Sequence, residues 1–351
     1  MGKFTVKVIG KIYSLFLFVV SLFRGHYSLD PTRILIARYT SAQNQASVDL
    51  RHGGAPGASP SGHILVIIPF RDRWDLTYEC LKSLNSSVLA PRIGLRVILA
   101  DNRSVLAETQ RGLSEAIDIF PNLQIEIFKA DYDFNFSRIN NDVVKEFARL
   151  NTVGLLFLNN DVLLADKSIV YTMYEYLECS PKLGVVGCTL LYPNHKVQHL
   201  FVAPGVKIIA AHPVKGHLAA DTWEWFKEPI RPVAAVTGAM LMMRPSDFNA
   251  VGGFDEDLPT IAQDVDLCLK TSLQLNKFSA TVRSFGTFHI ESPTKSAKFP
   301  ANEIEVFNKR WLNHPEMTKY YSQSFSRWSE RPLIKLMREP PYPSKVFGNT
   351  R

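Results

Sequence analysis

Short apolar runs that end in polar residues recur along the first half of this chain, with segments of helical spacing between them. The most pronounced run, residues 155–158, leads directly into Asn159-Asn160-Asp161. A continuous apolar run predicts a strand buried on both faces, as in the middle of a parallel sheet. Because ligands of open α/β sheets bind just beyond the carboxyl ends of such strands, Asn159-Asn160-Asp161 marks a candidate ligand site.

The carboxylate of Asp161 suits a hard divalent ion. Mg²⁺ or Mn²⁺ takes one or two carboxylates and fills its other positions with water and substrate phosphates. The alternative interpretation is a loop in which the Asn and Asp side chains bond to their own backbone.

The alternation continues on either side of this run. Further strands are predicted at residues 64–69, 95–100 and 124–128. Helical spacing is found over residues 75–84, around Leu113, Ile117 and Phe120, and over residues 139–150. Strands that alternate with helices predict βαβ units and a parallel sheet. Its strand ends share one edge, which gathers three polar clusters: Arg71-Asp72-Arg73, Asp101-Asn102 and Asn159-Asn160-Asp161. For Asp101-Asn102 a plain turn is the alternative.

The second half has a different pattern. Residues 185–191 and 233–243 are each predicted to form a strand, and we interpret the four histidines between them (His195, His199, His212 and His217) as structural. Asp264 and Asp266 begin a predicted helix, where acids are also favoured simply by the helix dipole. Residues 281–285 are strand-like and precede His289.

The first 30 residues stand apart from the rest. Three lysines precede the apolar run 12–23, which is shorter than the roughly 20 residues that span a bilayer, and no small-residue cleavage site follows. We predict that this segment associates with an anionic membrane surface, with a helix packed on the protein as the alternative. Residues 31–62 end in a Gly-, Pro- and Ser-rich stretch and are predicted to be a linker.

The composition and the lack of several sequence motifs exclude some classes of function. The net charge of +7 favours anionic partners, but no Lys/Arg block interleaved with aromatic residues is present, so nucleic acid is not expected. The four cysteines show no CxxC or Cys/His spacing, which argues against a zinc site or a disulfide framework. No GxGxxG or GxxxxGK[ST] motif occurs, so neither a dinucleotide-binding nor a P-loop site has support.

Eight short motifs, taken in order, resemble those of the family 2 glycosyltransferases, and most closely the bacterial branch that includes rhamnosyltransferases. The resemblance covers residues 63–325 and leaves 326–351 as a C-terminal tail. The motifs are Val66-Ile67-Ile68-Pro69, Asp101-Asn102-Arg103-Ser104, Phe134-Asn135-Phe136-Ser137 with Ile139-Asn140-Asn141, Leu158-Asn159-Asn160-Asp161, Val236-Thr237-Gly238-Ala239-Met240, Val251-Gly252-Gly253-Phe254-Asp255-Glu256, Asp264-Val265-Asp266-Leu267-Cys268 and His289-Ile290-Glu291-Ser292.

The resemblance implies a GT-A fold: one α/β domain with a central, mostly parallel sheet flanked by helices, a nucleotide-sugar-binding first half and an acceptor-binding second half. Seven residues are then expected on the nucleotide-binding side: Pro69, Arg71, Asp72, Asp101, Asn141, Asn160 and Lys295. Three are expected around the donor sugar and acceptor: Gly238, Ala239 and Asp255.

The catalytic roles carry over in the same way. Asp264 matches the family's catalytic base, and Asp161 and His289 match ligands of Mg²⁺ or Mn²⁺. Two positions depart from the family pattern: Gln263 precedes the base where Glu or Asn is common, and Asn159 replaces the first acid of the DxD motif.

The leading hypothesis is an inverting transferase at the cytoplasmic face of the cell membrane. It would move a sugar from a nucleoside-diphosphate sugar to a glycan or lipid-linked acceptor in cell-surface polysaccharide synthesis. Resemblance to the branch alone favours dTDP-rhamnose as donor. The alternatives are a catalytically silent nucleotide-sugar-binding scaffold and a nucleotidyltransferase, although the latter should carry a Gly-rich loop after its first strand, where Arg71-Asp72-Arg73-Trp74-Asp75 has no glycine.

Overall fold

The computed structural model describes residues 62–90, 93–207, 209–222, 227–290, 300–318, 321 and 325–330. The predicted membrane-associating segment, nearly all of the linker, Lys295 and the end of the tail lie outside these residues. The first strand, β1, begins at Gly62, two residues before the predicted strand 64–69.

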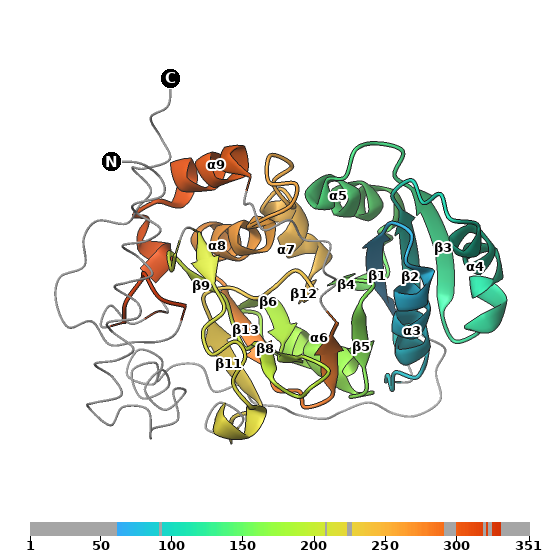
Figure 1. The fold of residues 1–351 in the computed structure, drawn as a ribbon, viewed down its shortest axis with the longest axis horizontal. Helices are drawn as coiled ribbons and strands as arrows, with labels where there is room; N and C mark the ends of the chain where they lie inside the picture. The colour runs from blue at the N-terminus through green and yellow to red at the C-terminus, as the bar shows by residue number, and fades with distance from the viewer. Residues whose placement is uncertain are drawn as a thin grey trace.

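An eight-stranded sheet organises the domain (Figure 1). Strand β4 lies near its middle, between β1, to which it is parallel, and β12, to which it is antiparallel. The pairs β1–β2, β2–β3 and β6–β13 are also parallel. In spatial order the strands are β11 (Ile230–Val233), β13 (Phe278–Val282), β6 (Leu183–Cys188), β12 (Met240–Met243), β4 (Thr152–Leu158), β1 (Gly62–Phe70), β2 (Ile93–Asp101) and β3 (Gln124–Lys129).

Helices cover both faces of the sheet, as the sequence predicted for this α/β fold (Figure 1). Side chains of β1 explain why: alternate residues enter two different hydrophobic clusters, so neither face of the strand is polar. One cluster contains residues of α3 (Trp74–Asn85), α4 (Ala107–Ile119) and α6 (Ile169–Cys179). The other contains residues of α5 (Phe136–Phe147), α7 (Pro245–Ala250), α8 (Gln263–Leu275) and α9 (Ala301–Trp311).

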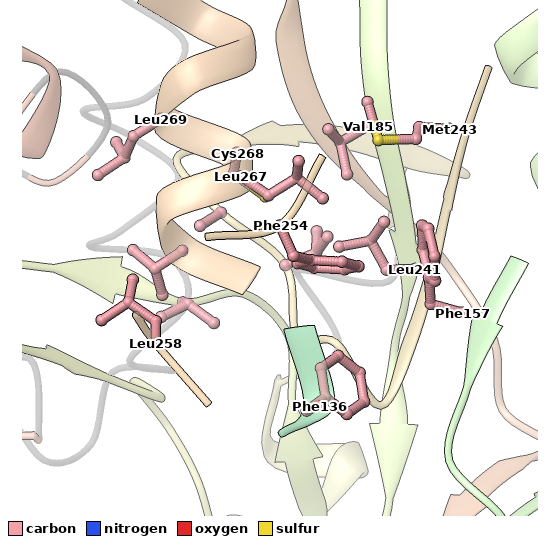
Figure 2. Packing of buried hydrophobic residues seen from close by; sticks show 14 of the residues in the cluster. Phe136, Phe157, Val185, Leu241, Met243, Phe254, Leu258, Leu267, Cys268 and Leu269 are labelled. Atoms are coloured by element: carbon pink, nitrogen blue, oxygen red, sulfur yellow. The ribbon is translucent and has the colours of Figure 1, made fainter. Parts of the chain in front are cut away.

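Aromatic side chains fill the second cluster where the two halves of the chain meet. Phe157 of β4 lies edge-on to Phe254, with ring centroids 4.8 Å apart, and Phe254 lies edge-on to Phe136 at 5.6 Å (Figure 2). Buried aromatic side chains contribute large apolar area and prefer such tilted contacts. The cluster therefore fixes the start of α5 and the loop before α8 against the central strand.

A smaller sheet lies beside the main one, with strand order β5-β14-β7-β8. The four strands are β5 (Val162–Leu164), β14 (Thr287–His289), β7 (Leu190–Leu191) and β8 (Val197–His199). It joins segments that are more than 100 residues apart in sequence, since His289 pairs with Val162. A short hairpin of β9 (Ala203–Pro204) and β10 (Ala210–Ala211) follows β8.

Two long strands predicted from apolar runs are wrong. Residues 185–191 divide at Thr189 into β6 and β7, which belong to different sheets, and residues 233–243 divide into β11 and β12. An apolar run reports burial but not direction, and both runs stay largely buried through their bends. The strand expected at 281–285 overlaps only the end of β13, Phe278–Val282, and Phe285 beyond it is 58% exposed.

Two helix predictions also need correction. The helix expected at 139–150 begins at Phe136, because the side chain of Asn135 accepts a hydrogen bond from the backbone N–H of Arg138 and caps it, and it ends at Phe147. In α4, Leu113 is buried as expected but Ile117 is 56% exposed, so the apolar face is narrower than the spacing indicated.

Candidate functional site

Three polar strand ends meet at one edge of the sheet, as their parallel directions require. Phe70 pairs with Asp101 in register, and Asp101 pairs with Lys129 at the end of β3. The ends of β1, β2 and β3 are therefore neighbours, with β4 and Asn159 on the other side of β1. This is the edge at which ligands of open α/β sheets bind.

Asp101 is buried at this edge and its carboxylate is held from two sides. One oxygen accepts the backbone N–H of Ser104 at 2.9 Å, and the other lies 2.6 Å from the Lys129 ammonium. Burial alone raises the pKa of the Asp101 carboxyl, but the contacts with Lys129 and Ser104 outweigh it, so the pKa lies below its ordinary value. Lys129, whose side chain is half exposed, was not singled out in the sequence.

Asp72 joins the loop after β1 to the loop after β2. One of its carboxylate oxygens accepts the backbone N–H groups of Val105 and Leu106, both at 2.9 Å, and its own N–H donates to the Ser104 hydroxyl. The residue has φ of 52°, a left-handed conformation uncommon for a residue with a side chain. Ser104 thus brings the two predicted nucleoside-binding acids together. Pro69 is buried in β1 just before this loop, and Arg71 is exposed in it.

Asp161 and His289 form the second part of the site. The Nε2 atom of His289 lies 3.0 Å from Oδ1 of Asp161, and both residues are over 90% buried. Asp161 directly follows the β4 strand end, whereas His289 arrives on β14 of the smaller sheet. The two residues predicted from sequence as metal ligands are therefore in contact.

Gln198 determines which nitrogen of His289 faces Asp161. Its amide donates to the backbone carbonyl of His289 at 3.4 Å, and its Oε1 lies 2.7 Å from Nδ1 of the same residue. A carbonyl oxygen only accepts, so the amide NH₂ must face it, and Oε1 must then face a protonated Nδ1. In the neutral imidazole Nε2 therefore carries a lone pair.

That arrangement places two acceptors, the Nε2 lone pair and the Asp161 carboxylate, opposite each other. A positive charge between them, a proton or a metal ion, satisfies both. Ligands about 2.1 Å from an octahedral ion lie about 3.0 Å apart at adjacent vertices, which matches the observed separation. Metal-bound histidines usually donate their second N–H to a carbonyl or carboxylate, as His289 does to Gln198. The residues present fit a divalent cation.

Two ligands suffice for such an ion. Within the described residues there is no group of three or more His, Cys, Asp or Glu side chains placed to hold a metal. Mg²⁺ and Mn²⁺ sites commonly use one or two protein groups and complete their shell with water and substrate phosphates. Asn159 adds an amide beside the pair, with Nδ2 3.5 Å from Nε2 of His289.

Asp264 lies in the first turn of α8, and a short segment links it to the Asp161 side of the site. The backbone N–H of Gly238 donates to Oδ2 of Asp264 at 2.8 Å. The carbonyl of the next residue, Ala239, accepts the backbone N–H of Asn159 at 2.9 Å. A Cβ at position 238 would lie 3.4 Å from that of Asp264, at the limit of ordinary contact. Gly238 and Ala239 therefore stand between the predicted base and the predicted metal ligands.

Three other predicted residues have clear structural partners. Asn160 donates to the Thr77 hydroxyl on α3 at 3.0 Å. Both ends of the Asn141 amide bond the backbone of Phe254, which ties α5 to the loop of residues 253–256 rather than to the strand ends. Asp255, in the same loop, forms an ion pair with Arg310 of α9 at 2.7 Å.

Asp266, His199 and His212 have structural partners too. Asp266 is fully buried and bonded to Arg310 and Trp311, so it ties α8 to α9. His199 and His212 approach each other with 3.1 Å between their Nδ1 atoms. Burial, together with the nearby His212 and His289, holds the pKa of His199 well below its ordinary value.

Two residues of the candidate site, Gln198 and Lys129, were not predicted from the sequence. Gln198 lies in a strand of three residues that shows no periodicity, and its partner His289 is 91 residues away. Lys129 directly follows the predicted strand 124–128, as the other polar residues follow their strands, but it was not grouped with them. As for membrane contact, the helices in the described part of the chain include none that is both long and apolar enough to cross a bilayer.

The chain resembles known proteins in both sequence and structure. It is 31% identical over 240 residues to the O-antigen biosynthesis protein RfbC of Myxococcus xanthus, and 29% identical over 269 residues to the uncharacterized protein y4gI of Sinorhizobium fredii. These matches cover 67% and 72% of this chain but only 18% and 28% of those longer proteins. No family model matches.

Two solved structures share the fold. A mannosyltransferase of Pyrobaculum calidifontis, in complex with GDP-Man and Mn²⁺, superposes with a TM-score of 0.52 at 13% identity, over 79% of this chain and 68% of that one. GalNAc-T7 with UDP, GalNAc and Mn²⁺ gives 0.53 at 11% identity, over 72% and 48%. The α/β fold of the chain is thus of the GT-A type found in these glycosyltransferases.

Proposed function

We propose that this chain is a glycosyltransferase that moves a sugar from a nucleoside-diphosphate sugar to a hydroxyl group of a glycan or lipid-linked acceptor. The observation that carries the proposal is the link through Gly238 and Ala239. It connects the carboxylate of Asp264 to the end of β4, two residues before Asp161 of the Asp161–His289 pair, on a fold shared with transferases whose structures hold a nucleotide and Mn²⁺.

Asp264 is the proposed catalytic base. Its carboxylate takes the proton of the acceptor hydroxyl as that oxygen forms a bond to the anomeric carbon, while the bond from this carbon to the nucleoside diphosphate breaks. Attack from the side opposite the leaving group inverts the anomeric configuration. A carboxyl group titrates near pH 4 in water, so it is ready to act as a base at neutral pH. The Gly238 N–H orients the carboxylate.

Asp161 and His289 are the proposed protein ligands of a divalent ion, which when bound stabilises the negative charge on the leaving diphosphate. The ion is Mg²⁺ or Mn²⁺, and we favour Mn²⁺ because the two solved structures that share this fold contain it. Asp72 and Asp101, joined through Ser104, are proposed to line the nucleoside side. Lys295 stays a sequence prediction for the phosphates.

The second candidate is a silent nucleotide-sugar-binding scaffold on the same fold. One observation favours it: both oxygens of Asp264 already accept backbone N–H groups, from Gly238 and Val265. A carboxylate has about four lone-pair positions, however, so each oxygen retains capacity for a proton from an acceptor.

Donor turnover by the purified chain tests the proposal. A panel of nucleotide sugars would be incubated with Mn²⁺ or Mg²⁺, with and without lipid-linked acceptors, and released nucleoside diphosphate measured. We expect one donor to be consumed, with rates at least about 10²-fold lower in Asp161→Ala and Asp264→Asn. Asp118→Ala on the exposed face of α4 is the matched control. Nucleotide binding without turnover, under every condition and unchanged by Asp264→Asn, would favour the scaffold instead.

The cellular role follows from the relatives. RfbC is an O-antigen biosynthesis protein, and we propose that this chain also acts in cell-surface polysaccharide synthesis. Membership of family 2, its rhamnosyltransferase branch and a place at the inner face of the membrane belong to the same proposal.

A further inference from the structure

The segment that leads into α8 has a strained backbone. Ala262, immediately before the helix, has φ of 63° and ψ of 0°, a left-handed conformation for a residue with a Cβ. Such a conformation is strained and persists only where surrounding contacts hold it. Asp264 follows two residues later, so whatever holds Ala262 also sets where that carboxylate lies.

Glu303 of α9 holds this segment. One carboxylate oxygen accepts the backbone N–H groups of Thr260 and Ile261 at 2.8 and 2.9 Å, and the other accepts the Thr260 hydroxyl at 2.6 Å. Glu303 is 1% exposed. Hydrogen bonds to a charged acceptor are roughly twice as strong as neutral ones, and three converge on this one group.

The C-terminal end of α9 contacts the first turn of α8, which carries Asp264 and Asp266. Arg310 and Trp311 both bond the carboxylate of Asp266, at 2.5 and 2.8 Å. Helix α9 therefore contacts the chain just before Asp264 through Glu303 and just after it through Trp311. The Glu303 hydrogen bonds lie on the strained segment itself, whereas those of Arg310 and Trp311 lie on Asp266 inside α8.

We propose that Glu303 is a positioning residue for Asp264. This inference rests on the proposed function, because it assigns Asp264 the role of base. By fixing Thr260 and Ile261, Glu303 keeps Ala262 left-handed and directs the first turn of α8 so that Asp264 meets Gly238. A shift of about 1 Å in a reacting group can cost about 10²-fold in rate without weakening substrate binding.

Three variants separate positioning from mere stability. Glu303→Leu keeps the volume and removes every acceptor. Glu303→Gln keeps an oxygen for the two N–H groups and loses the charge. Trp311→Phe is the matched control, since it removes the hydrogen bond from α9 to Asp266 of α8 and keeps the hydrogen bonds of Glu303 to Thr260 and Ile261.

We expect kcat to fall about 10- to 100-fold in Glu303→Leu and less than 10-fold in Glu303→Gln. The affinity for UDP, GDP or dTDP with Mn²⁺ should stay within about threefold of the original, since the reacting atoms alone are displaced. Trp311→Phe should lower the unfolding midpoint and leave kcat unchanged. Equal kcat in the original and both Glu303 variants, or a parallel loss of kcat and nucleotide affinity, would overturn the inference.

Hydrogen exchange measured by mass spectrometry gives a second readout that needs no turnover. In Glu303→Gln we expect faster hydrogen exchange only in peptides that cover residues 259–266. In Trp311→Phe we expect faster exchange along both α8 and α9. Uniform exchange changes in both variants would reject the positioning role. If the unmodified chain transfers no sugar, the proposed function fails. The hydrogen-exchange experiment still shows whether Glu303 holds residues 259–266 in place.

Discussion

At the scale of single residues, the site depends on one amide. Gln198 bonds His289 twice, through its backbone carbonyl and through Nδ1, and so leaves Nε2 free of a proton in the neutral ring, as the proposed metal ligand requires. A leucine at position 198 would leave both tautomers of His289 open. Only one of these has a lone pair on the side of Asp161, where we propose the cation.

The variant Gln198→Leu should therefore bind Mn²⁺ about 10- to 100-fold more weakly, the usual effect of losing a partner of a metal-bound histidine. Calorimetry measures the affinity, and ¹⁵N NMR of the imidazole shows which nitrogen is protonated. Gln124→Leu, at an exposed glutamine of β3, is the control. A wild-type spectrum with the proton on Nε2 would contradict the assignment.

The lowered pKa of His199 predicts how the free energy of unfolding depends on pH. Its pKa is lowered well below the ordinary value of about 6.5, so between these two values the unfolded chain binds a proton that the folded chain does not. Its contribution to stability is complete above about pH 6.5 and decreases as the pH falls toward the folded pKa.

Urea unfolding at pH 7.5 and pH 5.5 measures this contribution. The chain should lose stability on acidification, by up to about 1.4 kcal/mol per pH unit from this group, and His199→Asn should lose less. His195→Asn changes an exposed histidine and should behave like the original chain. An identical acid loss in His199→Asn would show that other groups dominate.

At the scale of elements, the contact between α3 and α4 depends on a glycine, Gly112, which leaves room for the ring of Trp74. A Cβ at Gly112, in the middle of α4, would lie 2.0 Å from the ring of Trp74. Helix propensity alone would favour alanine over glycine by about 1 kcal/mol. The overlap with the indole ring acts in the opposite direction, and overpacking typically costs about 1–3 kcal/mol.

We expect the overlap to win, so that Gly112→Ala lowers the free energy of unfolding by about 1–2 kcal/mol. Ser114→Ala on the exposed face of the same helix should be neutral or slightly stabilising. Chemical denaturation of both variants checks this, and a more stable Gly112→Ala would mean that Trp74 moves aside at little cost.

The elements also show how far the sequence could predict the structure. The runs in β1, β2 and β4 were identified because a strand buried on both faces needs apolar residues at every position. Residues 185–191 and 233–243 failed for the same reason, since burial continues through their bends. Glu303 and Gln198 could not be foreseen, because their partners lie 43 and 91 residues away and no local pattern links them.

At the scale of the whole molecule, the domain joins residues 62–158, to which we assign the nucleotide, to a second half that supplies Asp264 and His289. Motifs predicted that Asp161 and His289 act together, and the structure places them in contact through the smaller sheet. The comparisons extend the fold to transferases of very different sequence.

Residues 1–30 add a prediction for the intact chain. Full-length protein should sediment with vesicles that contain anionic lipid, and a chain beginning at residue 31 should not, because the lysines before residues 12–23 supply about 1 kcal/mol each near such a surface. Neutral vesicles and added salt should both weaken the binding. Equal sedimentation of the two chains would place the membrane contact elsewhere or remove it.

The position of β12 affects how the protein is made. Strands β3, β2, β1 and β4 are complete once Leu158 has been synthesised, but the neighbour of β4 begins at Met240, 82 residues later (240 minus 158). At about 5–20 residues per second the ribosome needs about 4–16 s to supply it. During that time the nascent chain carries an unpaired, strongly apolar strand edge, which is prone to aggregate. Chaperone demand during translation should therefore peak in this interval and end when β12 inserts.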